Sequence, residues 1–281
     1  MTKTPQSKSS RPHSRHRLTS QTVMRSVRPL TTLPALFISH GVPTLAIEKN
    51  ATTNALARIG QNLPKPQAIV IMSAHWVADS LTICNNPKPQ TWHDFQGFSE
   101  LNGFEYPALG HPLLAESLAS QLNEFGVSCQ FNPLRPLDHG VWSPLAHLYP
   151  EANVPIIQIA LPRHFDAYAC YQLGAMFEAL RHEQILLIGS GNITHNLHRL
   201  AWYNEQEEPD AKTFKTWLLH QLKTDIPTAL DWRSYPNIEA VHPTSEHLLP
   251  LFFALGAGQR VSAVHESMAH HSLGMDIYRF D

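Results

Sequence analysis

The sequence predicts an α/β fold, a single domain with a central, mostly parallel or mixed sheet flanked by helices. Short apolar runs rich in β-branched residues end at turn signals and alternate with segments of helical texture. Runs of this kind are typical of buried parallel strands. The chain has 281 residues, 43% of them hydrophobic, which is enough for one large domain with a sizeable core.

The strands and helices follow from these runs in chain order. We expect strands at 33–39, 68–73, 81–84, 127–131, 154–160, 185–188, 261–265 and 277–280. We expect helices at 45–59, 112–125, 142–148, 168–181, 211–222 and 244–255. In the last of these, Thr244 is a plausible N-cap, which would place His247 in the first turn. There the positive end of the helix dipole disfavours imidazolium.

Residues 85–112 are rich in Pro, Gly, Asn and aromatic side chains and predict a long ordered loop. A loop of this length in a compact domain is usually functional, often as a wall or lid over a site.

Histidines are the anomaly of the composition, at 18 residues. His40, His75 and His195 each follow an apolar run, whereas His139 lies in a turn and His247 at the start of the last predicted helix. In open α/β sheets ligands bind outside the carboxyl ends of the strands, so histidines there can converge. Neutral imidazole is the commonest protein ligand for a transition metal. The sequence therefore predicts a metal site at the carboxyl edge of the sheet.

The charge is unevenly distributed along the chain. Residues 1–30 hold seven of the 21 Lys and Arg and none of the 23 acidic residues, so the remainder carries a net charge of −9. That balance argues against nucleic-acid binding through phosphate contacts. We interpret 1–32 as a disordered basic extension and 33–281 as the catalytic domain. The extension resembles a transit peptide in composition only and has no secretory h-region.

Three widely spaced cysteines without a CxxC pair indicate reduced thiols and a cytoplasmic protein. No apolar stretch approaches the roughly 18 residues of a membrane span. The sequence gives no indication of the oligomeric state.

Six short fragments, taken together and in order, resemble the class III extradiol ring-cleaving dioxygenases, in particular the DOPA-dioxygenase-like branch. The resemblance covers roughly residues 34–281. The fragments are Ser39-His-Gly-Val-Pro43, Ser73-Ala-His-Trp76, His93-Asp-Phe, Asp138-His-Gly, Gly191-Asn-Ile-Thr-His195-Asn-Leu and Pro243-Thr-Ser-Glu-His247. One segment departs from the pattern, because His271-Ser-Leu-Gly-Met275 stands where the family has Gly-Ser-Leu-Ser-Met.

The resemblance implies a role for each histidine. His40, His75 and His247 would hold the metal, and His195 would be either a further ligand, most simply with zinc bound, or the catalytic base. His139 would be a second active-site histidine, able to bond substrate or oxygen, and His93 would help to shape the substrate pocket.

The implied reaction is cleavage of a DOPA-like catechol ring with O₂ at an Fe(II) centre, and Zn(II) could occupy the same site. Two alternatives stay open on the sequence alone. One is a zinc hydrolase, although there is no HExxH signature and Glu246 is the only nearby candidate base. The other is a metal-binding protein without catalytic activity.

Overall fold

The computed structural model describes residues 1–4, 32–202, 204 and 206–281. The prediction that residues 1–32 are disordered falls mainly on residues 5–31, which lie outside the described residues. None of the helices in the described ranges is long and apolar enough to cross a membrane.

An eight-stranded mixed sheet forms the centre of the domain, with the strand order β4-β3-β5-β2-β6-β1-β10-β7. The four inner strands β5, β2, β6 and β1 are mutually parallel, whereas β10 and β7 pair antiparallel at one edge. The large strands are β1 (Ala35–Ser39), β2 (Ala68–Ala78), β5 (Ile156–Pro162), β6 (Ile185–Gly191), β7 (Val261–His265) and β10 (Ile277–Phe280). The short ones are β3 (Thr82–Cys84), β4 (Gln130–Asn132) and the separate hairpin β8 (Met268–Ala269) and β9 (Leu273–Gly274).

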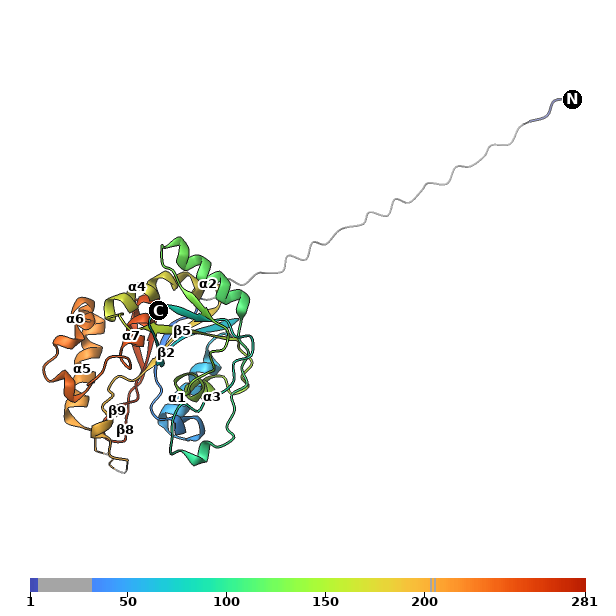
Figure 1. Ribbon diagram of the computed structural model, residues 1–281. Coiled ribbons are helices and arrows are strands. Elements are labelled where there is room, and N and C mark those ends of the chain that lie inside the picture. The colour runs from blue at the N-terminus through green and yellow to red at the C-terminus, as the bar shows by residue number, and fades with distance from the viewer. Residues whose placement is uncertain (5–31, 203, 205) are drawn as a thin grey trace.

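Helices cover both faces of the sheet, as Figure 1 shows. They are α1 (Ala51–Asn62), α2 (Pro112–Glu124), α3 (His139–Leu148), α4 (Ala167–Met176), α5 (Pro209–Thr224), α6 (Ile226–Leu230) and α7 (Leu249–Ala257). Short 3-10 helices are η1 (Pro43–Ile47), η2 (Ser99–Leu101), η3 (Glu178–Glu183), η4 (Leu197–Arg199), η5 (Trp232–Ser234) and η6 (Ile238–Ala240).

The two-residue alternation of the strands divides the core between the two faces. On β1, Phe37 packs in the cluster that includes α4, α5 and α7. Its neighbours Leu36 and Ile38 pack in the cluster that includes α1 and α3. Both faces of the inner strands are therefore buried, which explains why these segments are continuously apolar in the sequence.

The α/β single-domain class with a mixed sheet is confirmed, but several element boundaries differ from the prediction. The segment expected as one helix at 45–59 is η1 followed by α1, because Asn50 forms a capping box with Thr53 and starts a new helix there. The segment 168–181 is divided into α4 and η3, and β2 extends beyond Ser73 to Ala78.

The predicted start of the last helix was wrong. The helix α7 begins at Leu249, and the Thr244 hydroxyl donates to the Glu246 carboxylate at 2.7 Å instead of capping a helix. His247 therefore lies in the turn before α7, not in its first turn. The helix α6 and the β8–β9 hairpin were not predicted.

Candidate metal centre and active site

Three histidines from distant parts of the chain converge at the carboxyl edge of the sheet. His40 directly follows β1, His75 lies in β2, and His247 lies in the turn before α7. One ring nitrogen from each of the three lies within 4.8 Å of the others. The Nε2 atoms of His40 and His75 are 3.0 Å apart, within hydrogen-bonding distance.

Burial keeps this cluster neutral. Burial, together with the neighbouring histidines, lowers the pKa of His40 and His247 well below the ordinary value and that of His75 to about 4. Uncharged imidazoles with converging nitrogens suit a divalent metal ion, so the donor set fits the metal that the sequence predicts.

The tautomer of His40 follows from its hydrogen bonds. The Ser190 hydroxyl donates its one proton to the Gly140 carbonyl, so it accepts a hydrogen bond from Nδ1 of His40 at 2.9 Å. The Nε2 atom of His40 is therefore unprotonated and faces the cluster. Partners of this kind orient metal-binding histidines in general.

His247 is oriented by its neighbour in the sequence. Its Nδ1 donates to the Glu246 carboxylate at 3.1 Å, which leaves Nε2 as the free nitrogen. Burial raises the pKa of Glu246, but hydrogen bonds from His247 and Thr244 outweigh burial and lower it overall. Glu246 is thus an ionised partner of His247.

Strand β6 positions His247 through a close backbone approach. The Asn192 amide donates to the His247 carbonyl at 2.8 Å. A Cβ atom at Gly191 would overlap that carbonyl oxygen, so the position requires glycine. This contact explains the glycine at the end of β6.

His195 stacks on His247, with ring centroids 3.5 Å apart and an interplanar angle of 7°. Its backbone amide donates to the Val241 carbonyl at 3.1 Å. Burial lowers the pKa of His195 to about 4, so the ring is neutral near pH 7. His195 therefore lies beside the three converging histidines, with a ring available to accept a proton.

His139 is the first residue of α3, and its ring centroid lies 4.0 Å from that of His75. Its Nδ1 and its backbone amide both donate to Asp94, at 2.9 and 3.0 Å. Burial raises the pKa of Asp94, but hydrogen bonds from His139 outweigh burial and lower it overall. The same carboxylate lies 3.7 Å from Nδ1 of His75.

His93 is not part of the cluster. Its side chain is exposed, contacts the Phe104 carbonyl at 3.0 Å, and stacks on Phe95. Phe95 is the ring of the 85–112 loop that reaches His139, with centroids 5.7 Å apart. The structure therefore brings five of the six predicted site histidines together and leaves His93 in the surrounding loop.

Sequence reasoning missed two residues that contact the cluster, Asp94 and Ser190. Asp94 belongs to the fragment His93-Asp-Phe, where histidine was favoured over its neighbour. Ser190 lies between two glycines at the end of β6, just beyond the strand predicted at 185–188. In each case the signal in the sequence was a polar residue next to a histidine or a glycine.

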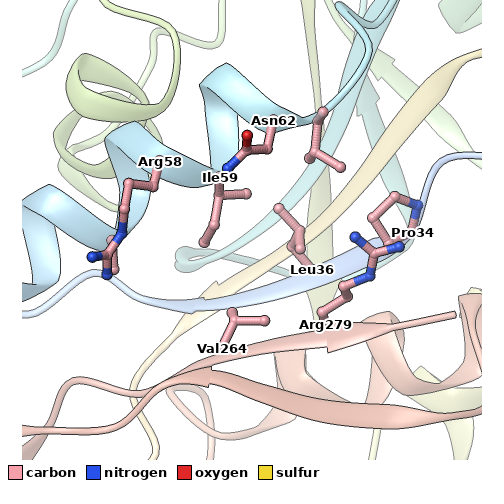
Figure 2. A pocket seen from close by; sticks show the side chains of 9 residues that line it. Pro34, Leu36, Arg58, Ile59, Asn62, Val264 and Arg279 are labelled. Atoms are coloured by element: carbon pink, nitrogen blue, oxygen red, sulfur yellow. The ribbon is translucent and has the colours of Figure 1, made fainter.

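A separate cavity of about 240 Å³ lies between α1 and the strands β1, β7 and β10 (Figure 2). Its floor is apolar, and the guanidinium groups of Arg58 and Arg279 lie at its rim. Arg279 is paired with Asp281 at 2.6 Å. No histidine lines this cavity, so its chemistry is unrelated to the metal cluster.

Known proteins resemble the chain over nearly its whole length. The family described as the catalytic LigB subunit of aromatic ring-opening dioxygenase matches residues 34–281. A protein of Escherichia coli K12 named 4,5-DOPA dioxygenase extradiol is 35% identical over 233 residues, covering 81% of this chain and 86% of its own. A protein of the same name from Beta vulgaris is 33% identical over 262 residues, covering 87% and 95%.

A solved structure shares the fold. The crystal structure of an uncharacterised protein from Escherichia coli K12 superposes with a TM-score of 0.77 at 30% identity. The match covers 89% of this chain and 100% of that one.

Proposed function

Because the chain belongs to the LigB family of aromatic ring-opening dioxygenases, we propose that its histidine cluster holds Fe(II) and cleaves the ring of a DOPA-like catechol. The chain is an extradiol ring-cleaving dioxygenase and depends on a metal. Family membership favours this function over the hydrolase and the non-catalytic alternatives. Our choice of a DOPA-like substrate rests on relatives named 4,5-DOPA dioxygenase extradiol.

The observation that carries the proposal is the convergence of His40, His75 and His247 as neutral imidazoles. We assign these three as metal ligands, and Zn(II) could occupy the same site. An Fe(II) ion held by these three residues would supply open positions for the catechol oxygens and the redox chemistry that O₂ requires.

His195 is assigned as the general base. Its neutral ring can accept a proton from a catechol hydroxyl, and its stacking on His247 holds it beside the ligands. His139 is assigned to bind the substrate. Asp94 holds its Nδ1–H, which leaves Nε2 to bond an oxygen of the substrate.

We assign the catalytic domain to residues 33–281, and its composition bears on the substrate class and on the cellular location. Its negative net charge supports a small-molecule substrate with O₂ in preference to nucleic acid. The free cysteines Cys84, Cys129 and Cys170 support a cytoplasmic location. His93 would influence the substrate pocket indirectly, through Phe95.

The test is oxygen uptake by protein loaded with Fe(II) under anaerobic conditions and then given DOPA, protocatechuate or plain catechol. We expect uptake to match the formation of a yellow ring-opened product one to one, with DOPA preferred. Bound iron without oxygen uptake for any catechol would contradict the proposal.

His195→Asn tests the assignment of the base. We expect metal content to stay at the wild-type level and turnover to fall about 10²–10⁴-fold, the usual contribution of a general base. Unchanged turnover would contradict the role, and loss of metal would indicate that His195 is itself a ligand.

A further inference from the structure

Arg135 contacts the rings of two tryptophans and the backbone of His75. Its guanidinium carbon is 4.9 Å from the ring centroid of Trp76 and 5.1 Å from that of Trp92. Trp76 directly follows His75 in β2, and Trp92 belongs to the long loop, two residues before Asp94. The guanidinium thus joins the strand that carries His75 to the loop that carries Asp94.

The same guanidinium bonds the backbone of His75. Nη2 donates to the His75 carbonyl at 3.2 Å and to the Asp138 carboxylate at 2.6 Å. Asp138 is fully buried and also accepts from the Ser73 hydroxyl at 2.7 Å. The Ser73 hydroxyl in turn accepts the His75 amide at 3.2 Å, so Asp138 is linked to both polar groups of the His75 backbone.

Hydrogen bonds of the Trp92 backbone also hold the 85–112 loop in place. The Trp92 amide donates to the Leu137 carbonyl at 2.7 Å, and the Trp142 indole donates to the Trp92 carbonyl at 3.0 Å. With its backbone bonded and its ring against Arg135, Trp92 fixes where the following residues lie. Asp94 can then reach both His139 and His75.

We propose that Arg135 is a positioning residue that couples the 85–112 loop to His75. A planar, delocalised guanidinium can lie against aromatic rings while its N–H groups donate to a carbonyl and a carboxylate. Lysine would preserve the charge beside Asp138 but not this geometry. The inference rests on the proposed function in one respect, the assignment of His75 as a metal ligand.

The experiment compares Arg135→Lys with Arg233→Lys. Arg233 is a matched control because its guanidinium lies 4.8 Å from the Trp232 ring, on an exposed part of the chain outside the cluster. For Arg135→Lys we expect metal affinity to fall about 10-fold, as for other groups that orient metal ligands. The absorption spectrum of the Co(II)-substituted protein should also change, and kcat should fall more than KM rises.

Hydrogen exchange gives a readout that needs no metal. We expect the amides of residues 91–95 to exchange at least 10-fold faster in Arg135→Lys than in the wild type, with Arg233→Lys unchanged. Trp92→Leu keeps the ion pair with Asp138 and should reproduce the faster loop exchange, even if Arg135→Lys proves too unstable to study.

The outcomes separate this inference from the proposed function. Wild-type affinity, Co(II) spectrum and loop exchange in Arg135→Lys would overturn the positioning role, as would wild-type exchange in Trp92→Leu. A wild-type protein that binds metal but consumes no oxygen would overturn the dioxygenase proposal and leave these readouts intact. If the wild type bound no metal, the exchange rates of the amides of residues 91–95 would by themselves test the positioning role of Arg135.

Discussion

At the scale of single residues, hydrogen bonds decide which ring nitrogen of a histidine is free. In His40, the bond to Ser190 protonates Nδ1 and leaves Nε2 bare. In His247, the bond to Glu246 holds the proton on Nδ1 in the same way. Because only an unprotonated nitrogen binds a metal, these uncharged or anionic neighbours contribute to affinity without touching the ion.

Ser190→Ala removes the acceptor of His40 Nδ1–H. We expect metal affinity to fall about 10–100-fold, because the ring loses its fixed tautomer and orientation. The measurement is competition with a chromophoric chelator. Ser143→Ala is the matched control, since this buried hydroxyl in α3 has no hydrogen-bond partner among the described residues. Equal affinities of the two variants would contradict the role of Ser190.

His242 makes the stability of the protein depend on pH. Burial lowers its pKa from 6.5 to about 4, and its Nε2 donates to the Ile193 carbonyl at 2.7 Å. Between these pH values the unfolded chain binds a proton that the folded chain excludes, so stability is present above pH 6.5 and is lost as the pH falls. The loss from this residue is roughly 3 kcal/mol by pH 4.

The check is urea unfolding of wild type and His242→Gln between pH 7.5 and 4. The variant should be less stable at pH 7.5, and the difference should narrow as the pH falls, because glutamine takes up no proton. A difference that stays constant with pH would exclude this linkage.

His40, His75 and His195 were predictable because each follows an apolar run, and the edge of a parallel sheet gathers such positions. The hydrogen-bond partners of the site histidines were not predictable in this way. Asp94 reaches His139 only because the loop folds back over α3, and Ser190 meets His40 because β6 pairs with β1. Neither relation leaves a periodic trace in the sequence.

At the scale of elements, the segment before α7 shows where pattern reasoning failed. The residues 248–257 are continuously apolar and buried, so their periodicity did not mark a start for the helix. Thr244 had the chemistry of a cap but bonded Glu246 instead. The helix could therefore be predicted, but its first residue could not.

The close approach of β6 to this segment leads to a prediction for Gly191→Ala. The added Cβ would overlap the His247 carbonyl oxygen and push His247 away from the other histidines. We expect a loss of roughly 3 kcal/mol in unfolding free energy, a large effect for one methyl group, together with loss of tight metal binding. Thermal unfolding and metal titration provide the measurements.

Gly103→Ala is the control for this variant. Gly103 has open space around it but a φ of +82°, so alanine there costs only the strain of the left-handed region, about 1–2 kcal/mol. Its metal affinity should stay at the wild-type value. If Gly191→Ala bound metal equally well, the packing argument would fail.

At the scale of the whole molecule, the metal site joins segments from both ends of the domain. His40 follows the first strand, and His247 precedes the last large helix. A bound ion therefore adds its binding free energy to the stability of the fold. Removal of the metal should lower the melting temperature of the protein as a whole.

With free metal at 100 times its dissociation constant, the contribution is about 2.7 kcal/mol, or roughly 5–10 °C in a domain of this size. Differential scanning calorimetry with and without a chelator measures the shift. His40→Asn should melt at the same temperature in both conditions. A chelator shift of wild-type size in that variant would show that the metal stabilises the protein elsewhere.

The pairing of β1 with both β6 and β10 has a further consequence, for synthesis of the protein. The first strand can pair with β6 only after residue 191 has been made, and with β10 only after residue 280. Completion of the sheet therefore waits for the synthesis of β10, and folding is slowed by such distant pairings. His247 lies 207 residues after His40 in the sequence, so the three converging histidines can meet only after most of the chain has been made.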